Sequence, residues 1–239
     1  MILQPAIHAD WKKLLLANYV IDPDILKPFI PFQTELALWQ GKCYISLVGF
    51  RFLKVRIGGV PVPFHTNFNE VNLRFYVRRL SGHIWHYGVV FIKEIVALPV
   101  VTFVANTFFS EHYETLPLHH NIHHAKEALS VSYRWKKDIW HSMHIESGPN
   151  PSLIEDNTAE EFLTSQHWGY SKVNEEKTIE YSVEHPRWSV YPTIHYQIRT
   201  DFEKAYGQKF GFLNQTQPES VFLTEGSAII LKKRITVKF

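Results

Sequence analysis

Four histidines lie within six positions of the stretch LPLHHNIHHAKE, at His119, His120, His123 and His124. On a helix, histidines four residues apart would stack on one face, a spacing that binds zinc or copper. Pro117 and Asn121 disfavour a helix here. On a strand, His120 and His124 would share a face about 13 Å apart, which is too far for one ion. We therefore expect a partly exposed polar connection with no metal, and keep metal-dependent chemistry at His119–His124 as a weaker alternative.

A second set of polar side chains alternates with apolar ones in the stretch NEVNLRFYV. On a strand, one face would carry Glu70, Asn72, Arg74 and Tyr76. Such a face suits the polar end of a small cavity, where Arg74 would bind an anion through its guanidinium fork and Glu70 would transfer a proton. The alternative is that Glu70 and Arg74 pair with one another on a solvated face of an antiparallel sheet.

The stretch VEHPRWSVY supplies two further candidate substrate-binding residues, His185 and Trp188. Pro186 imposes an extended or turned path between two expected strands. A histidine at that position would shuttle protons near neutral pH. The structural alternative is that His185 bonds to the backbone while Trp188 fills the core.

Helix and turn signals outline the elements that must position these residues. Periodicity predicts a helix over DWKKLLLANYVI, and capping signals predict short helices after Asp22 and Thr158. Pro99 opens another helix. Hairpin turns are expected at 81–82 and at 225–226. About ten strand-like runs, rich in aromatic and β-branched residues, complete one α+β domain over 1–239 that is built on antiparallel sheet.

Composition narrows the classes of function. The chain has 239 residues, 15% of them aromatic, and a formal net charge of only +2, so nothing indicates a nucleic-acid partner. The longest apolar run, 95–105, is too short to span a bilayer, so no membrane partner is expected. The start of the chain lacks the pattern of a signal peptide. Cys43 is the only cysteine, which excludes an internal disulfide and suits a cytoplasmic protein.

Five stretches in order carry a family resemblance: IDPDILKPFIP, GKCYISLVGFRF, FNEVNLRFYV, EEFLTSQHWGYSKV with TIEYSVEHPRWSVY, and SVFLTEGSAIIL. Together they resemble the YqjF-like family, a bacterial domain of unknown function. That family resembles, more distantly, the acetoacetate decarboxylase superfamily. The resemblance implies a mainly antiparallel β-cone or barrel with short outer helices and an internal ligand cavity.

The same resemblance bears on the chemistry. Acetoacetate decarboxylase-type enzymes use a lysine that forms a Schiff base, in a lysine pair that follows a Tyr-Pro step. The matching step here is Leu98-Pro99, and Val100 and Val101 follow it. Valine forms no imine, and Lys93 is a less favoured displaced substitute. The superfamily also places a carboxylate on an aromatic-x-Glu step, which matches Glu70.

Two hypotheses for a small-molecule ligand remain open. In the first, the chain is an enzyme that performs acid/base chemistry on a carbonyl or carboxylate compound, with Glu70 as the proton-transfer group. In the second, it is a non-catalytic binding module that has kept the cavity. Neither requires a cofactor, and both are compatible with a homo-oligomer.

Overall fold

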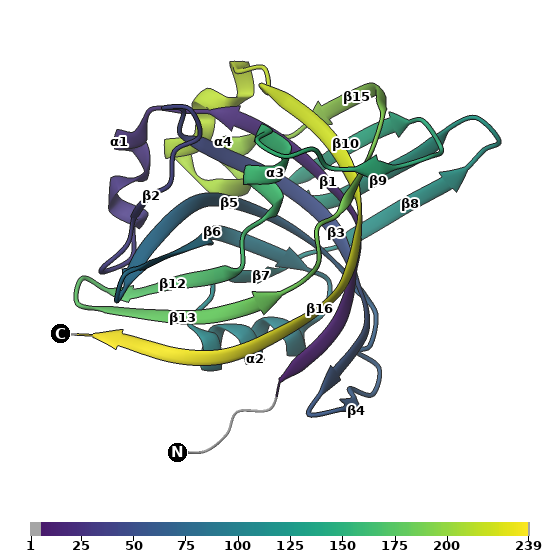
Figure 1. Cartoon of the computed structure of the whole chain (residues 1–239). Coiled ribbons are helices and arrows are strands. Elements are labelled where there is room, and N and C mark those ends of the chain that lie inside the picture. Colours follow the sequence, from purple (N-terminus) through teal and green to yellow (C-terminus); the bar gives the residue numbers. More distant parts are fainter. Residues whose placement is uncertain (1–5, 239) are drawn as a thin grey trace.

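The computed structural model describes residues 6–238 and shows a strand-rich protein with short helices (Figure 1). Its strands are β1 Ile7–Val20, β2 Glu35–Leu36, β3 Tyr44–Ile57, β4 Val60–Pro61, β5 Phe68–Ser81, β6 Ile84–Val96, β7 Tyr113–Thr115, β8 Leu118–His124, β9 Leu129–Lys137, β10 Ile139–Ser147, β11 Ser152–Leu153, β12 Trp168–Asn174, β13 Lys177–Glu184, β14 Ser189–Tyr191, β15 Thr193–Arg199 and β16 Ser220–Lys238. Its α-helices are α1 Pro23–Leu26, α2 Pro99–Phe109, α3 Ala159–Thr164 and α4 Phe202–Tyr206, with 3₁₀ turns at Lys27–Phe29 and Gln208–Gln215.

The larger sheet closes on itself. Its strands follow the order β1-β3-β5-β6-β12-β13-β16, and β16 pairs back with β1. Within the described residues, the pairings of β6 with β12 and with β7 are parallel and the others are antiparallel. The prediction of a mainly antiparallel β fold is confirmed. A closed path of strands gives the sheet an inner face on which polar side chains can be kept from water.

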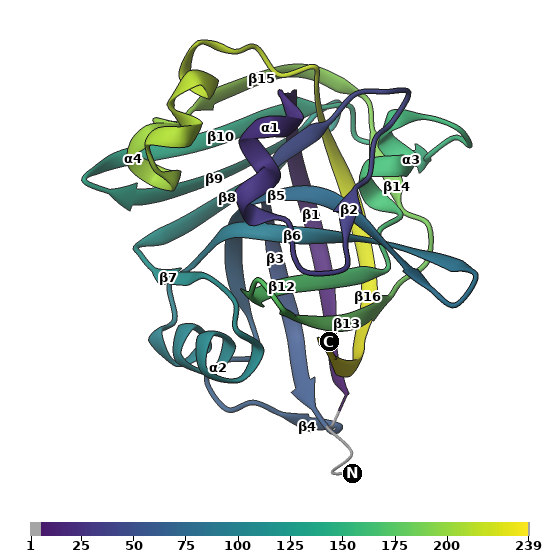
Figure 2. The same cartoon turned by 90° about the vertical axis from the view of Figure 1, so that its left-hand side faces the viewer.

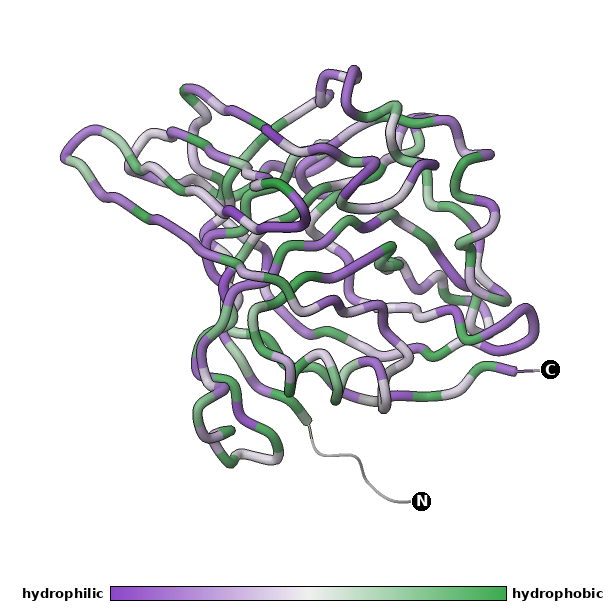
Figure 3. Tube along the Cα trace, turned by 180° about the vertical axis from the view of Figure 1, so that it is seen from behind, coloured by the Kyte–Doolittle hydropathy of each residue, from purple (hydrophilic) through white to green (hydrophobic). Residues whose placement is uncertain are grey.

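The smaller sheet, in the order β15-β10-β9-β8, packs against the outside of the larger one. Gly49 of β3 permits the contact, because a Cβ there would lie 2.6 Å from the ring of Tyr133 on β9. The hairpin of β8 and β9 projects from the body and is mostly hydrophilic (Figure 3). The histidine run is therefore an edge strand rather than an unpaired connection, since each residue of 118–124 has a partner on β9.

The helix predicted over DWKKLLLANYVI is wrong, because this segment forms the central strand β1 between β3 and β16. Leu15 and Ala17 join the core that faces the small sheet, whereas Leu14 and Leu16 join the core inside the ring. A strand that is buried on both faces has a continuous apolar run, and such a run lacks the alternation that separates strand from helix.

The other predicted helix starts are confirmed. The side chain of Asp22 accepts from Asp24 N at the start of α1, Pro99 begins α2, and Thr158 caps α3. The helix α2 lies at the opposite end of the molecule from α1 and α4 (Figures 1 and 2). No helix in residues 6–238 is long and apolar enough to cross a membrane.

The hairpin predicted at 225–226 is wrong, since β16 runs through as one strand. Gly226 has a φ of 72°, and a Cβ there would lie 2.1 Å from the carbonyl oxygen of Trp11. Glycine is required at this position by the close approach of β1, and the sequence signal for a turn reflects that requirement.

Candidate functional site

A cavity of about 500 Å³ lies between the inner face of the larger sheet and α2. Most of its wall is aliphatic or aromatic, with Phe52, Val55, Phe68, Val104 and Leu231 among the lining residues. Acidic and phenolic side chains gather at one part of the wall: Glu94, Glu111, Tyr113 and Tyr181. A mostly apolar pocket with a few convergent polar groups is the usual form of a small-molecule site.

Glu70 and Glu94 reach this polar wall from neighbouring strands. Glu94 on β6 stands directly opposite Asn72 on β5, so both glutamates project from the same face of the sheet. The Nδ2 atom of Asn72 donates to Glu70 Oε1 over 2.8 Å, and the Tyr113 hydroxyl donates to Glu70 Oε2 over 2.8 Å. Glu94 keeps one carboxyl oxygen, Oε2, without a hydrogen-bond partner among residues 6–238.

Glu111 approaches from the loop between α2 and β7. The Ser171 hydroxyl donates to its Oε1 over 2.8 Å, and Tyr181 forms a second hydrogen bond with its carboxyl group. Gly169 gives Tyr181 its position, because these two residues are partners across β12 and β13. A Cβ at Gly169 would lie 2.1 Å from the Tyr181 ring, so only glycine lets the ring lie across β12.

Burial dominates the electrostatics of the three carboxyl groups. It raises the pKa of Glu70 to about 7, against hydrogen bonds from Asn72 and Tyr113 and the charge of Arg74 that lower it. Burial likewise raises the pKa of Glu111 to about 7. Burial, together with the charges of Glu111 and Glu70, raises the pKa of Glu94 well above its ordinary value. These groups therefore hold protons at pH values where a solvated glutamate is ionised.

The predicted strand face of Glu70, Asn72, Arg74 and Tyr76 is divided between two environments. All four side chains are buried, and no ion pair joins Glu70 to Arg74 in the described part of the chain, so they do not form a solvated pair. Glu70 and Asn72 lie behind Tyr113 at the cavity. Arg74 lies away from it, with Nη2 donating to the carbonyl of Leu163 over 3.2 Å and its guanidinium 5.8 Å from the Tyr76 ring.

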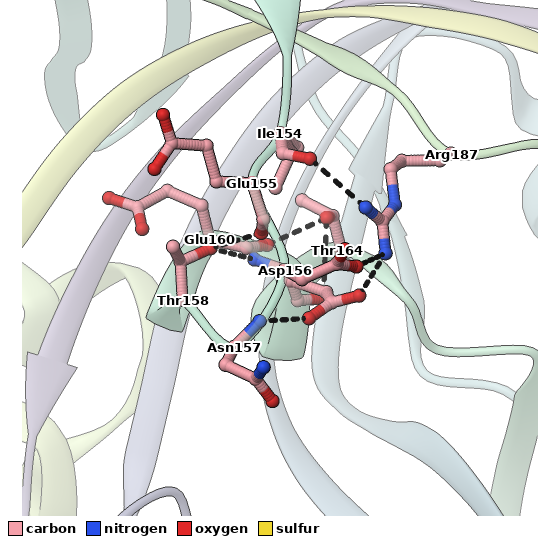
Figure 4. Close-up of polar contacts among 9 residues, drawn as sticks. Ile154, Glu155, Asp156, Asn157, Thr158, Glu160, Thr164 and Arg187 are labelled. Atoms are coloured by element: carbon pink, nitrogen blue, oxygen red, sulfur yellow. Dashed lines mark hydrogen bonds and ion pairs between the residues drawn. The ribbon is translucent and has the colours of Figure 1, made fainter.

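His185 and Trp188 lie beside Arg74 rather than on the cavity wall. Their rings stack with centroids 4.6 Å apart, and the indole nitrogen of Trp188 donates to Ser227. Burial lowers the pKa of His185, which favours its neutral form. Figure 4 shows Arg187 bonding to the carbonyl of Ile154 and to Asp156, which precede α3. Arg187 also binds Glu161 in the first turn of α3. This segment therefore anchors α3 and the core inside the ring.

The positions that match the lysine pair of the related enzymes lie at the cavity. Val100 and Val101, in the first turn of α2, both line it. Lys93 projects from the opposite face of β6 from Glu94. Its ammonium group donates to the carbonyl of Ala205 over 2.9 Å and pairs with Glu114 at 2.9 Å. No lysine stands at the matched positions to form an imine, and Lys93 does not line the cavity.

Sequence reasoning missed Glu94, Glu111, Tyr113 and Tyr181, which supply the acidic wall. Glu94 left a signal, because a lone carboxylate in the apolar run VVFIKEIVAL is unusual for a buried strand. Glu111, Tyr113 and Tyr181 lie in segments of mixed polarity, where such residues do not stand out. No group of three or more metal-ligating side chains in residues 6–238 is arranged to hold an ion, the histidine run on β8 included.

Comparison with known proteins places the chain in a family. The DUF2071 model, described as an uncharacterized conserved protein, matches residues 8–228. The chain belongs to the DUF2071 family. A 68-residue segment is 35% identical to the uncharacterized protein YqjF of Bacillus subtilis (strain 168), and covers 28% of this chain and 28% of YqjF. The predicted YqjF-like membership is thereby confirmed.

Solved structures show the same fold at low identity. An acetoacetate decarboxylase-like enzyme from Sphingomonas wittichii RW1 superposes with a TM-score of 0.65 at 11% identity, over 98% of this chain and 94% of that one. Acetoacetate decarboxylase from Legionella pneumophila subsp. pneumophila str. Philadelphia 1 gives 0.64 at 10% identity, over 97% and 87%. The enduracididine biosynthesis enzyme MppR, complexed with pyruvate, gives 0.64 at 11% identity, over 99% and 91%. The DUF2071 chain therefore has an acetoacetate decarboxylase-like fold, as the resemblance implied.

Proposed function

We propose that this DUF2071 protein binds a small, largely apolar carbonyl compound in the 500 Å³ cavity and moves a proton on it with its buried carboxyl groups. The observation that carries the proposal is the meeting of Glu94 and Glu111 at the wall of a mostly apolar cavity, with Glu70 joined to Glu94 through Tyr113. Relatives of the same fold include MppR, which was solved with pyruvate, a small keto acid. This similarity of fold supports the substrate class.

The proposed chemistry is keto–enol exchange. One protonated carboxyl group donates its proton to the carbonyl oxygen of the ligand, while a carboxylate accepts a proton from the adjacent carbon. The C–H electron pair becomes the C=C bond, and the former C=O π pair binds the donated proton. A pKa of about 7 at Glu70 and Glu111 leaves both protonated and ionised carboxyl groups present near neutral pH. Glu94 and Glu111 line the cavity, so they are the groups that react with the ligand. Glu70, behind Tyr113, supplies and accepts protons.

The non-catalytic binding module remains the second candidate, and the valines at 100 and 101 favour it. They extend the apolar wall where the related enzymes carry reactive lysines. In that case the raised carboxyl pKa values follow from burial and from the neighbouring carboxyl charges, and serve no reaction. For either candidate, the free and buried Cys43 supports a location in the reducing cytoplasm.

Proton exchange in D₂O separates the two candidates. A panel of neutral ketones and keto acids is incubated with the protein, and loss of the proton NMR signal from the carbon next to the carbonyl is followed. We expect exchange above the buffer rate for part of the panel, and a rate lower by roughly a hundredfold in Glu94→Gln, the typical contribution of a general acid or base. The matched control Glu146→Gln, on the smaller sheet, should keep the wild-type rate. Binding without exchange would support the non-catalytic module instead.

A further inference from the structure

A second hollow, of about 600 Å³, lies on the outer side of the ring where β8 meets β1, β3 and β16. It is separate from the first cavity, because Phe52 lines the first and Arg51 lines the second. Consecutive residues of a strand point to opposite faces, so β3 forms the partition between them. The polar residues of the hollow are Lys12, Lys13, Arg51, His120, Asn121, His124 and Glu225. Basic side chains therefore outnumber acidic ones in this hollow.

An irregularity in β1 brings two neighbouring lysines into this hollow. The register between β1 and β3 shifts between Lys12 and Leu15, and Lys13 has a φ of 55°. A regular strand would send Lys12 and Lys13 to opposite faces. Here both ammonium groups bind Glu225, with Lys12 at 3.3 Å, and Lys13 also donates to the Tyr191 hydroxyl over 2.6 Å. A lysine in the left-handed region has a strained backbone, and the surrounding contacts must hold it in that conformation.

Arg51 leaves the hollow with an excess of positive charge. It stands directly opposite Lys12 across β1 and β3, a like-charged pair that weakens the sheet. Its Nε atom is buried without a hydrogen-bond partner, and within residues 6–238 no carboxylate lies at ion-pair distance from its guanidinium. Three permanent cations therefore face the single carboxylate of Glu225. An acceptor with negative charge would satisfy a guanidinium in these surroundings.

Two of the clustered histidines form the remaining wall. His120 and His124 lie on one face of the edge strand β8, with Ile122 between them, and all three line the hollow. Burial and the nearby charge of Arg51 lower the pKa of His120. An anion between His120 and Arg51 would offset the charge of Arg51 and raise the pKa of His120, because it would stabilise the imidazolium form.

We propose that the hollow bounded by Lys12, Lys13, Arg51, His120 and His124 binds a polyvalent oxyanion of the phosphate type. Arg51 supplies the planar fork that matches two phosphate oxygens, and the lysines and histidines surround the rest of the charge. Glu225 holds the two lysine ammonium groups in place. Phosphate would be bound as the free ion or as part of a small phosphorylated molecule, since both present the same oxygens.

Isothermal titration with inorganic phosphate and with pyrophosphate tests the site in the full-length protein. We expect saturable binding of one anion, weakened roughly tenfold or more in Arg51→Gln, the usual cost of losing one charge-assisted hydrogen bond. The matched control is Lys54→Gln, three residues along β3, whose exposed ammonium group pairs with Asp10 away from the hollow. It should bind as the wild type does. Equal weakening in both variants, or no saturable binding, would overturn the proposal.

The histidines give a second readout that does not depend on the affinity itself. Phosphate should raise the pKa of the His120 ring, followed by NMR of the imidazole, and should leave the chemical shifts of the exposed His83 ring unchanged. Binding should strengthen as the pH falls through the histidine range, and this dependence should weaken in His120→Gln. A small phosphate monoester that binds more tightly than phosphate would identify a phosphorylated molecule as the source, and equal affinities would identify the free ion. An unmoved His120 titration at saturating phosphate would overturn the placement of the anion.

Discussion

At the scale of single residues, Tyr113 organises the proposed site. Its hydroxyl bonds to Glu70 over 2.8 Å, and it also forms a hydrogen bond with Glu94. Burial raises the pKa of Tyr113 well above its ordinary value, so it stays a neutral donor. One phenol therefore connects a carboxyl group behind the cavity wall with one on its surface. A chain of this kind suits proton transfer, because each member can donate and accept.

Gly169 gives a prediction at this scale. Gly169→Ala should destabilise the protein by about 1–3 kcal/mol, the usual cost of overpacking, because the new methyl group would occupy the place of the Tyr181 ring. Urea unfolding measures the change. The control Gly148→Ala should stay within about 0.5 kcal/mol of wild type, because its Cβ would make only ordinary contacts with Pro192.

A second substitution isolates the cause of that change. Adding Tyr181→Ala to Gly169→Ala removes the ring that the methyl group meets. The loss of stability in the double variant should therefore be smaller than the sum of the losses in the two single variants. Fully additive losses would show that the clash is not what makes glycine necessary at 169.

At the scale of elements, the two faces of β6 have different roles. Glu94 faces the cavity, while the neighbouring Lys93 faces α4 and pairs with Glu114. Both are charged residues within an apolar strand, and the register of β6 against β5 decides which one reaches the cavity. The caps at Asp22 and Thr158 were predictable because they depend on neighbours within three residues. The strand β1 was not, because its partners lie far away in the sequence.

The division of β6 predicts the outcome of imine trapping. Incubation with ketones and borohydride should leave Lys93 unmodified in peptide mass maps, because its ammonium group is engaged by Ala205 and Glu114 away from the cavity. Val101→Lys provides the positive control, since it introduces an amine at the cavity wall among apolar residues that favour its uncharged form. A ketone adduct mapped to Lys93 in the wild-type protein would contradict the placement of Lys93 on the face of β6 away from the cavity.

At the scale of the whole molecule, the closed path of strands makes the site possible. Glu70 and Glu94 are each about 2% exposed, on the inner face of a ring that α2 covers at one end. The sequence predicted the mainly antiparallel class, and the ligand cavity that its family resemblance implied stays a prediction. The sequence did not predict that Glu94, Glu111 and Tyr181 meet there, because they lie on different segments that only the closed sheet brings together. Arg74 and Trp188 also lie on the inner side of the ring, but in the part that apolar side chains fill, and neither lines the cavity.

The ring keeps buried carboxyl groups protonated up to neutral pH, at the cavity wall and behind it. Carbon-13 NMR of the glutamate carboxyl groups, titrated with pH and assigned with Glu70→Gln and Glu111→Gln, measures this protonation most directly. We expect two resonances with apparent pKa values of about 7, each lost in its own variant, and the groups are neutral below and charged above that pH. Titration of every glutamate near the ordinary value of about 4.3 would show instead that the ring does not hold these protons.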